Sequence, residues 1–228
     1  MIPYKYAVAA LLVFAPVVAW ATLQSPGDFE HGVIQYASSK PTDPVARLQD
    51  RIDNGSVKLT FDSDWGYLPA LLDELNIPRS SQNLVFSKTS LQLLLISPKN
   101  PRALYFNDDV YVGGIAGSPL LEMASVDPDL GTVFYTLSQE EEARPQFQRE
   151  YYACLLCHDS AVTQGVPGLT MLSVLPNTDG RALPGIPIIP LNDRTPYKER
   201  WGGWYVTGTH GDQQHWGNLM SSSRVDKV

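Results

Sequence analysis

The sequence is short of cationic side chains and of long apolar runs, and each shortage excludes a class of protein. Lys and Arg number 17 against 24 Asp and Glu, which gives a formal net charge of -7. Nucleic acids bind basic faces because their phosphates must be neutralised, so this balance argues against a nucleic-acid partner. After Leu23 no stretch is long and apolar enough to cross a bilayer. The acidic balance suits a basic protein partner, or serves solubility alone.

Several signatures of enzymes and repeat proteins are also missing. The chain has no internal repeat, no low-complexity tract, no phosphate-binding glycine loop, no dinucleotide-binding glycine pattern and no Ser/His/Asp order. The 228 residues are 43% hydrophobic and 18% charged, which fits one ordinary globular domain or two small ones.

The first 21 residues have the pattern of an export signal. Residues 1–5 carry the positive charge of Lys5, residues 7–18 are apolar, and Ala19-Trp20-Ala21 offers small residues for cleavage. We therefore predict a periplasmic protein. Residues 1–21 serve either as a cleaved signal peptide or as an uncleaved N-terminal anchor that attaches the protein to the inner membrane.

Hydrophobic periodicity predicts a strand-rich first part. Apolar residues at helical spacing predict short helices over residues 45–52 and 65–75, and alternation predicts a strand over residues 56–61. Five further strands are expected at residues 84–86, 103–106, 110–112, 120–126 and 132–137.

Turn chemistry and capping patterns refine this outline. Residues 127–131, which contain Pro128 and Gly131, predict a hairpin between the last two strands, and Asn107-Asp108 predicts another turn. Ser138 and Glu141 form a capping box that predicts a helix start, with Pro145 opening a second helix. On that second helix one face would carry Phe147, Tyr151, Cys154, Leu155 and His158.

The remaining chain is dense in glycine and proline, so ordered loops are expected from residue 163 onward. The predicted fold is α+β and loop-rich. A strand-rich region at 22–137 packs beside a helical and loop-rich region at 138–228, and the two share one core.

The strongest chemical signal is Cys154-Leu155-Leu156-Cys157-His158. Cys-x-x-Cys-His is the signature of c-type haem attachment, in which two thiols bond to the porphyrin and the adjoining imidazole ligates iron. On a helix, Cys154 and His158 are one turn apart, so the motif can meet the edge and face of one macrocycle. We predict one covalent haem c, with His158 as an iron ligand. The predicted fold is not that of a standard small class I cytochrome c, in which this motif lies near the start of a helical domain.

Three other interpretations of the motif compete with haem attachment. A disulfide across such a short loop would constrain little chain entropy. A thioredoxin-like dithiol needs a βαβ context, which the Pro- and Gly-rich sequence after His158 does not offer. Zinc needs a further ligand from a distant histidine. Both cysteines of the chain fall in the motif, which favours haem.

The sixth iron position has several candidate ligands. His210 and His215 lie beside glycines, which permit close backbone approach to a ligand plane. The other candidates are His31, Met123, Met171 and Met220, or the position holds water or no ligand. Trp201, Trp204 and Tyr205 would cover the macrocycle, or equally form an ordinary aromatic core.

Three segments carry a resemblance to a known group. Residues 101–108, 165–168 and 200–211, the last reading Arg-Trp-Gly-Gly-Trp-Tyr-Val-Thr-Gly-Thr-His-Gly, resemble uncharacterised bacterial cytochrome c domain-containing proteins. The resemblance covers residues 87–218 and implies an exported haem protein. It adds weight to His210 and His215, but it implies no particular reaction.

These observations favour a mono-haem electron-transfer protein, or an electron-transfer subunit, that docks with a redox partner protein or a membrane complex. A peroxidase-like haem enzyme with an open distal site is the first alternative. A non-redox gas-binding or assembly subunit is the second.

Overall fold

The computed structural model describes residues 30–31 and 33–221. The predicted export segment at 1–21 lies outside these residues. Within the described part of the chain no helix is long and apolar enough to cross a membrane.

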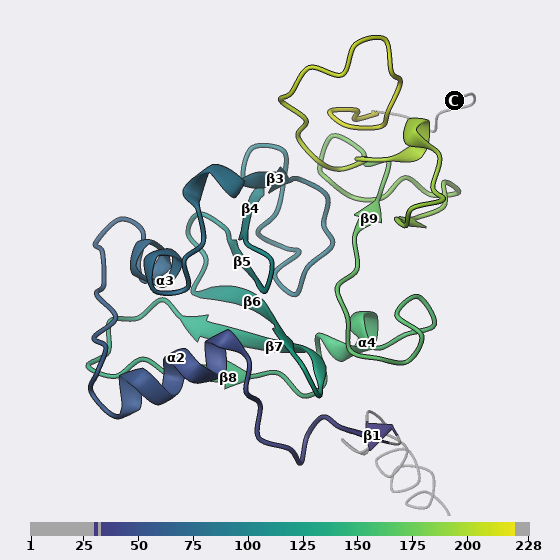
Figure 1. Cartoon of the computed structure of the whole chain (residues 1–228). Helices are drawn as coiled ribbons and strands as arrows, with labels where there is room; N and C mark the ends of the chain where they lie inside the picture. The colour runs from purple at the N-terminus through teal and green to yellow at the C-terminus, as the bar shows by residue number, and fades with distance from the viewer. Residues whose placement is uncertain (1–29, 32, 222–228) are drawn as a thin grey trace, which may run out of the picture.

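A six-stranded antiparallel sheet forms the centre of the molecule (Figure 1). Its strands follow one another along the chain as neighbours, in the order β3-β4-β5-β6-β7-β8. They are β3 (Asn83–Val85), β4 (Arg102–Phe106), β5 (Val110–Gly114), β6 (Leu120–Asp127), β7 (Gly131–Ser138) and β8 (Phe147–Arg149). Two small hairpins lie outside this sheet: β1 (Glu30–His31) with β2 (Ile34–Gln35), and β9 (Leu172–Ser173) with β10 (Ile189–Pro190).

The described residues form three α-helices, α2 (Pro44–Asp53), α3 (Leu68–Glu74) and α4 (Leu155–His158). Two short 3-10 helices cover Arg79–Ser81 and Tyr197–Glu199. The structure is therefore mostly β with some helix, which confirms the strand-rich part of the prediction. After α4 the chain is largely loops, as its Gly and Pro content predicts.

Helix α2 begins at a buried cap that also ties it to the sheet. One oxygen of Asp43 accepts hydrogen bonds from the backbone N–H groups of Val45 and Ala46, and the other accepts from the Tyr135 hydroxyl at 2.6 Å. Asp43 is fully buried. Burial, followed by the Asp43 hydrogen bond and charge, raises the pKa of Tyr135, so this hydroxyl keeps its proton and donates.

Alternation along the strands separates the two faces of the sheet. Leu121 and Met123 of β6, together with Val133 and Leu137 of β7, join the buried cluster that includes residues of α2 and α3. Glu122 lies between the two β6 residues and points to the other face, as does Phe134 on β7. The site described below lies on this second face.

Three predicted elements are wrong. Residues 138–158 do not form helices from Ser138 and Pro145, because Phe147–Arg149 instead pairs with β7 as strand β8. Only Leu155–His158 is helical, so the expected helical face running from Phe147 through Tyr151 to His158 does not exist. Residues 56–61 form no strand, because no neighbouring strand pairs with them, although Leu59 is buried.

The C-terminal segment is fastened to the β3 edge of the sheet. The Gly203 carbonyl accepts from the backbone N–H groups of Phe86 and Ser87, and the Tyr205 N–H donates to the Leu84 carbonyl at 2.9 Å. Through these bonds residues after β10 cover one edge of the central sheet.

Candidate haem-binding site

The Cys-x-x-Cys-His motif lies on α4, a single helical turn (Figure 1). The backbone N–H of His158 donates to the Cys154 carbonyl at 3.0 Å, which closes the turn. Leu155 is fully buried and packs in the main hydrophobic cluster, whereas Cys157 is exposed and Cys154 partly buried. The helix is therefore anchored through Leu155 while the motif side chains lie at or near the surface.

The loop after α4 orients the His158 ring. Nδ1 of His158 lies 2.9 Å from the carbonyl oxygen of Gly168 and 3.4 Å from Oγ1 of Thr170. A carbonyl can only accept, so Nδ1 carries the ring proton and donates it to Gly168. The lone pair of the neutral ring is then on Nε2. A second partner that fixes the tautomer in this way is what metal-ligating histidines have in proteins.

Burial keeps His158 neutral. Its pKa is lowered, mainly by desolvation, and the Gly168 hydrogen bond opposes this only in part. The ring packs on Phe134 of β7, with ring centroids 4.5 Å apart and planes at 45°. A neutral imidazole with a free Nε2 is the form that ligates iron.

The loop carrying Gly168 is itself docked on the turn between β6 and β7. The Thr132 N–H donates to the Pro167 carbonyl at 2.7 Å. Gly131, at φ 77°, lies so close to that carbonyl that a Cβ in its place would overlap the oxygen. The hairpin turn therefore fixes the loop that orients His158.

The two thiols do not resemble a reactive dithiol. They are free, not joined as a disulfide. Burial, followed by the charges of Glu150 and Glu122, raises the pKa of Cys154 to about 12. Dithiol oxidoreductases need a cysteine whose pKa is lowered, so this environment argues against the thioredoxin-like interpretation.

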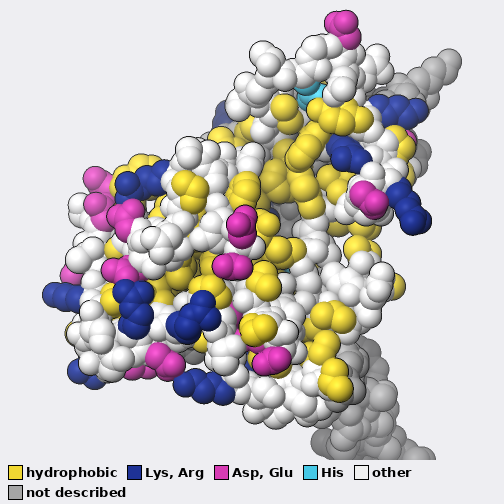
Figure 2. Space-filling model, in the orientation of Figure 1, with side chains coloured by type: hydrophobic (Ala, Val, Ile, Leu, Met, Phe, Trp, Pro, Cys, Tyr) yellow, Lys and Arg dark blue, Asp and Glu magenta, His cyan; other side chains and the backbone are white. Residues whose placement is uncertain are grey.

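Apolar side chains near the motif lie open to solvent. Leu156 is 56% exposed, and Val162 of the following loop 54%. Four more are between 40% and 44% exposed: Tyr151, Tyr152, Val166 and Leu169. Figure 2 shows hydrophobic side chains on the surface around the place that α4 occupies in Figure 1. Clustered exposed apolar surface marks a place where a ligand or partner packs, and these residues precede and follow the two cysteines closely in the sequence.

The predicted distal histidines lie elsewhere. His210 and His215 contact each other, with ring centroids 4.4 Å apart. They line a cavity of about 520 Å³ together with Lys198, Glu199, Gln213, Gln214, Trp216 and Leu219. In Figure 1 this C-terminal segment lies beyond β9, well apart from α4. The structure therefore brings the two histidines together but does not place them beside His158.

His215 has the opposite ring tautomer to His158. Nδ1 of His215 accepts from the Gly217 N–H at 3.0 Å, so the ring proton is on Nε2. Desolvation, with the neighbouring His210, lowers the pKa of His215 and keeps the ring neutral. Ligation through Nε2 would require this hydrogen bond to break and the proton to move.

The other candidate ligands are dispersed. Met123 is buried in the main core, Met220 is 40% exposed, and Met171 follows the loop that orients His158. His31 belongs to β1. Among the described residues, no three His, Cys, Asp or Glu side chains gather as a metal site.

The aromatic residues expected over the macrocycle make structural contacts. The Trp204 indole N–H donates to the Leu172 carbonyl at 2.9 Å, and the Tyr205 hydroxyl donates to the Pro98 carbonyl at 2.8 Å. Tyr205 also packs on Phe86. The Trp201 carbonyl accepts from the Trp204 N–H at 3.0 Å, and Trp201 has φ 70°. These contacts join the C-terminal segment to β3 and β9.

Sequence reasoning missed Phe134, Thr170 and the specific role of Gly168. The Pro-Gly pair shortly after the motif was a usable signal for Gly168, because it marks a turn that brings a carbonyl back toward α4. Phe134 gave no such signal, since a buried strand residue far away in sequence reaches His158 only through the fold.

Comparisons of the chain with protein-family models, with curated proteins and with solved structures found no match.

Proposed function

We propose that this protein is an exported mono-haem c-type cytochrome that transfers electrons, alone or as a subunit of a larger complex. The observation that carries the proposal is the hydrogen bond from His158 Nδ1 to the Gly168 carbonyl. It leaves Nε2 with its lone pair on a residue that follows two free thiols in a Cys-x-x-Cys-His motif.

The residues present fit a covalently held haem. Cys154 and Cys157 would bond to the porphyrin, and His158 would ligate its iron. Haem supplies one-electron redox chemistry when bound. The chain's own contribution is to hold the imidazole neutral and correctly oriented, and to offer an apolar surface through Leu156, Leu169 and their neighbours.

A single-haem carrier must pass its electron to another redox centre. We propose a redox partner protein or a membrane complex in the periplasm, where the export signal predicted at residues 1–21 would deliver the chain. The net charge of -7 favours a basic docking surface on that partner. The resemblance to bacterial cytochrome c domain-containing proteins agrees with this proposal and stays a prediction.

A haem protein with an open sixth position, acting on peroxide or binding a gas, is the second candidate. One observation favours it: His210 and His215 contact each other in a separate cavity. If neither reaches the iron, a small ligand can bind there. If one does, electron transfer is the natural role.

The test is production of the full chain in a host that attaches haem to c-type cytochromes. We expect a haem stain that survives denaturing electrophoresis, and its loss in the Cys154→Ala, Cys157→Ala double variant. A His210→Ala, His215→Ala double variant is the matched control, because it leaves the motif intact and should keep the stain.

The absorption spectra of these proteins separate the two candidates. A low-spin spectrum that becomes high-spin in the His210→Ala, His215→Ala variant would support ligation by one of the two histidines. A high-spin spectrum in both proteins, with rapid carbon monoxide binding, would support the open site. A wild-type protein without a stained band would overturn the haem proposal itself.

A further inference from the structure

A loop joins β3 to β4 (Figure 1) and presents leucine side chains to solvent. We call residues 88–100 the leucine loop. Leu94 is 82% exposed, and Leu91, Leu93 and Leu95 are between 39% and 51% exposed. Single exposed apolar side chains are ordinary on protein surfaces, but four within five consecutive residues form a patch that a partner covers.

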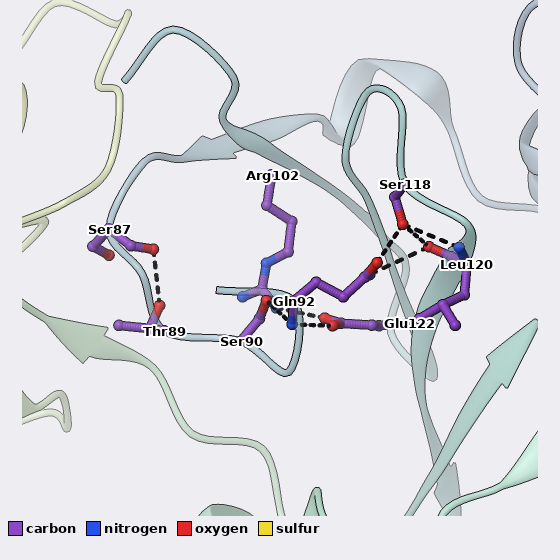
Figure 3. Close-up of polar contacts among 8 residues, drawn as sticks. All are labelled: Ser87, Thr89, Ser90, Gln92, Arg102, Ser118, Leu120 and Glu122. Atoms are coloured by element: carbon purple, nitrogen blue, oxygen red, sulfur yellow. Dashed lines mark hydrogen bonds and ion pairs between the residues drawn. The ribbon is translucent and has the colours of Figure 1, made fainter. Parts of the chain in front are cut away.

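Polar groups of the same loop point inward. The side-chain amide of Gln92 donates to the Leu120 carbonyl at 3.3 Å and accepts from the Ser118 hydroxyl. Its backbone N–H donates to Oε1 of Glu122 at 3.2 Å. Figure 3 shows Gln92 extending toward these groups, and Ile96 is fully buried. The loop is therefore fastened to the protein through Gln92 and Ile96, and the leucines form its outer surface.

Several backbone carbonyls of the leucine loop are bonded from within the chain. Nζ of Lys88 donates to the carbonyls of Leu93 and Ile96. Nδ2 of Asn100 donates to the Leu95 carbonyl at 3.1 Å. The apolar part of a bilayer offers no hydrogen bonds, so a loop can enter it only when such groups are already satisfied. A loop that binds a protein has no such requirement, because the partner can supply these bonds.

The leucine loop also lies in a cationic stretch of an acidic chain. Residues 75–107 contain no Asp or Glu, but they contain Arg79, Lys88, Lys99 and Arg102. The two arginines form ion pairs with carboxylates outside this stretch. The two lysines flank the exposed leucines, and Lys99 is itself exposed. Lysines beside an apolar patch attract anionic headgroups, and their long stems let the patch enter below the headgroup level.

We propose that the leucine loop docks this protein on a bilayer with anionic headgroups. Leu93 and Leu94 enter the boundary between headgroups and acyl chains, and Lys99 contacts the headgroups. The net charge of the chain is -7, so an anionic surface repels the molecule as a whole and favours approach through this cationic stretch. The inference does not depend on haem attachment.

The first measurement is co-sedimentation of the full chain with vesicles of phosphatidylcholine, with and without phosphatidylglycerol. Wild type should bind the anionic vesicles more tightly. The Leu93→Ser, Leu94→Ser double variant should bind them about tenfold more weakly, because binding scales with the apolar area that enters the bilayer. Lys99→Gln should weaken binding about fivefold, since one lysine near an anionic surface contributes that much.

Two matched controls have equivalent changes outside the loop. Ile188→Ser alters another half-exposed apolar side chain, and Lys58→Gln removes another exposed cation. Both should bind the anionic vesicles as wild type does, because neither residue belongs to the leucine loop.

The second measurement reports on the loop itself, even if residues 1–21 also hold the chain on the vesicle. A nitroxide on Leu94→Cys should become more accessible to oxygen and less accessible to a water-soluble nickel chelate when anionic vesicles are added. The same label on Ile188→Cys should show no such change. Wild-type protein treated with the label is the blank for Cys154 and Cys157.

Three results would overturn the proposal. The first is a label on Leu94→Cys that stays in water when the chain is on vesicles, or equal binding by wild type and the leucine double variant. The second is equal binding to vesicles with and without phosphatidylglycerol, which contradicts an anionic surface. The third is a wild type that ignores vesicles but self-associates through the leucines, which assigns the loop to an interface between copies of the chain.

Discussion

Gly131→Ala tests how firmly the β6–β7 turn holds the loop that orients His158. Gly131 has φ 77°, a left-handed conformation that costs an alanine about 1–2 kcal/mol. The new Cβ would also overlap the Pro167 carbonyl and lie 3.1 Å from Cγ1 of Val166. The Pro167 oxygen cannot avoid the new Cβ by a side-chain rotation, because it belongs to the backbone.

The loop must therefore move, and its bond to the sheet is lost. The Thr132 N–H donates to the Pro167 carbonyl at 2.7 Å, and Thr132 is only 4% exposed. Leaving this buried donor without a partner costs about 1–3 kcal/mol. We expect Gly131→Ala to lower the free energy of unfolding by about 2–5 kcal/mol in total.

Gly55→Ala is the matched control. Gly55 has nearly the same φ, 78°, but a Cβ there would meet nothing within 4 Å. It should cost only the conformational part, about 1–2 kcal/mol. Urea unfolding followed by circular dichroism measures both variants. Equal losses in the two would refute the reasoning, because the Pro167 contact would then contribute nothing.

Two more predictions concern stability. Asp43→Ala should lower the free energy of unfolding by about 2–5 kcal/mol, because it removes a helix cap and leaves the Tyr135 hydroxyl buried without an acceptor. A urea-unfolding loss below about 1 kcal/mol would contradict this. In the haem-free Cys154→Ala, Cys157→Ala variant, stability should fall as the pH drops below the ordinary His158 pKa of 6.5. The folded-state pKa is lower, so the unfolded chain binds more protons in that window. When His158→Gln is added, the free energy of unfolding should depend less on pH between pH 7 and pH 5. An unchanged pH dependence would refute the assignment to His158.

Local signals account for the parts of the fold that the sequence predicted. The hairpin around residues 127–131 and the turn at Asn107 are confirmed, because their chemistry acts over four or five residues. Helix α2 is confirmed for the same reason, because the apolar stripe that predicted it lies within one short segment. The structure adds a capping aspartate directly before the helix and a proline at its first turn.

The failures come from pairing between distant segments. Phe147 and Tyr151 have helical spacing, but the backbone near Phe147 bonds to Leu137 in the sheet instead. Pairing with a neighbouring strand stabilises a short segment more than its weak helix preference does. The capping box predicted at Ser138 does not start a helix; the Glu140 N–H donates a local hydrogen bond to the Ser138 hydroxyl.

The candidate site shows the same difference between local signals and contacts made by distant segments. The motif residues could be identified from spacing alone, and Gly168 was within reach because it lies only ten residues after His158. Phe134 could not be associated with the motif, because only the fold brings β7 beside His158. Ligation by His210 or His215 stays a prediction, and the structure shows them in contact with each other.

The fastening of the C-terminal segment to β3 also bears on aggregation. An edge strand with free N–H and carbonyl groups is a template on which another chain can add a strand. Here Gly203 and Tyr205 bond to the backbone of residues 84–87 and occupy that edge. A chain that has not yet docked this late segment exposes β3, so the sheet is open to pairing with other copies until residues 203–205 have bonded to it.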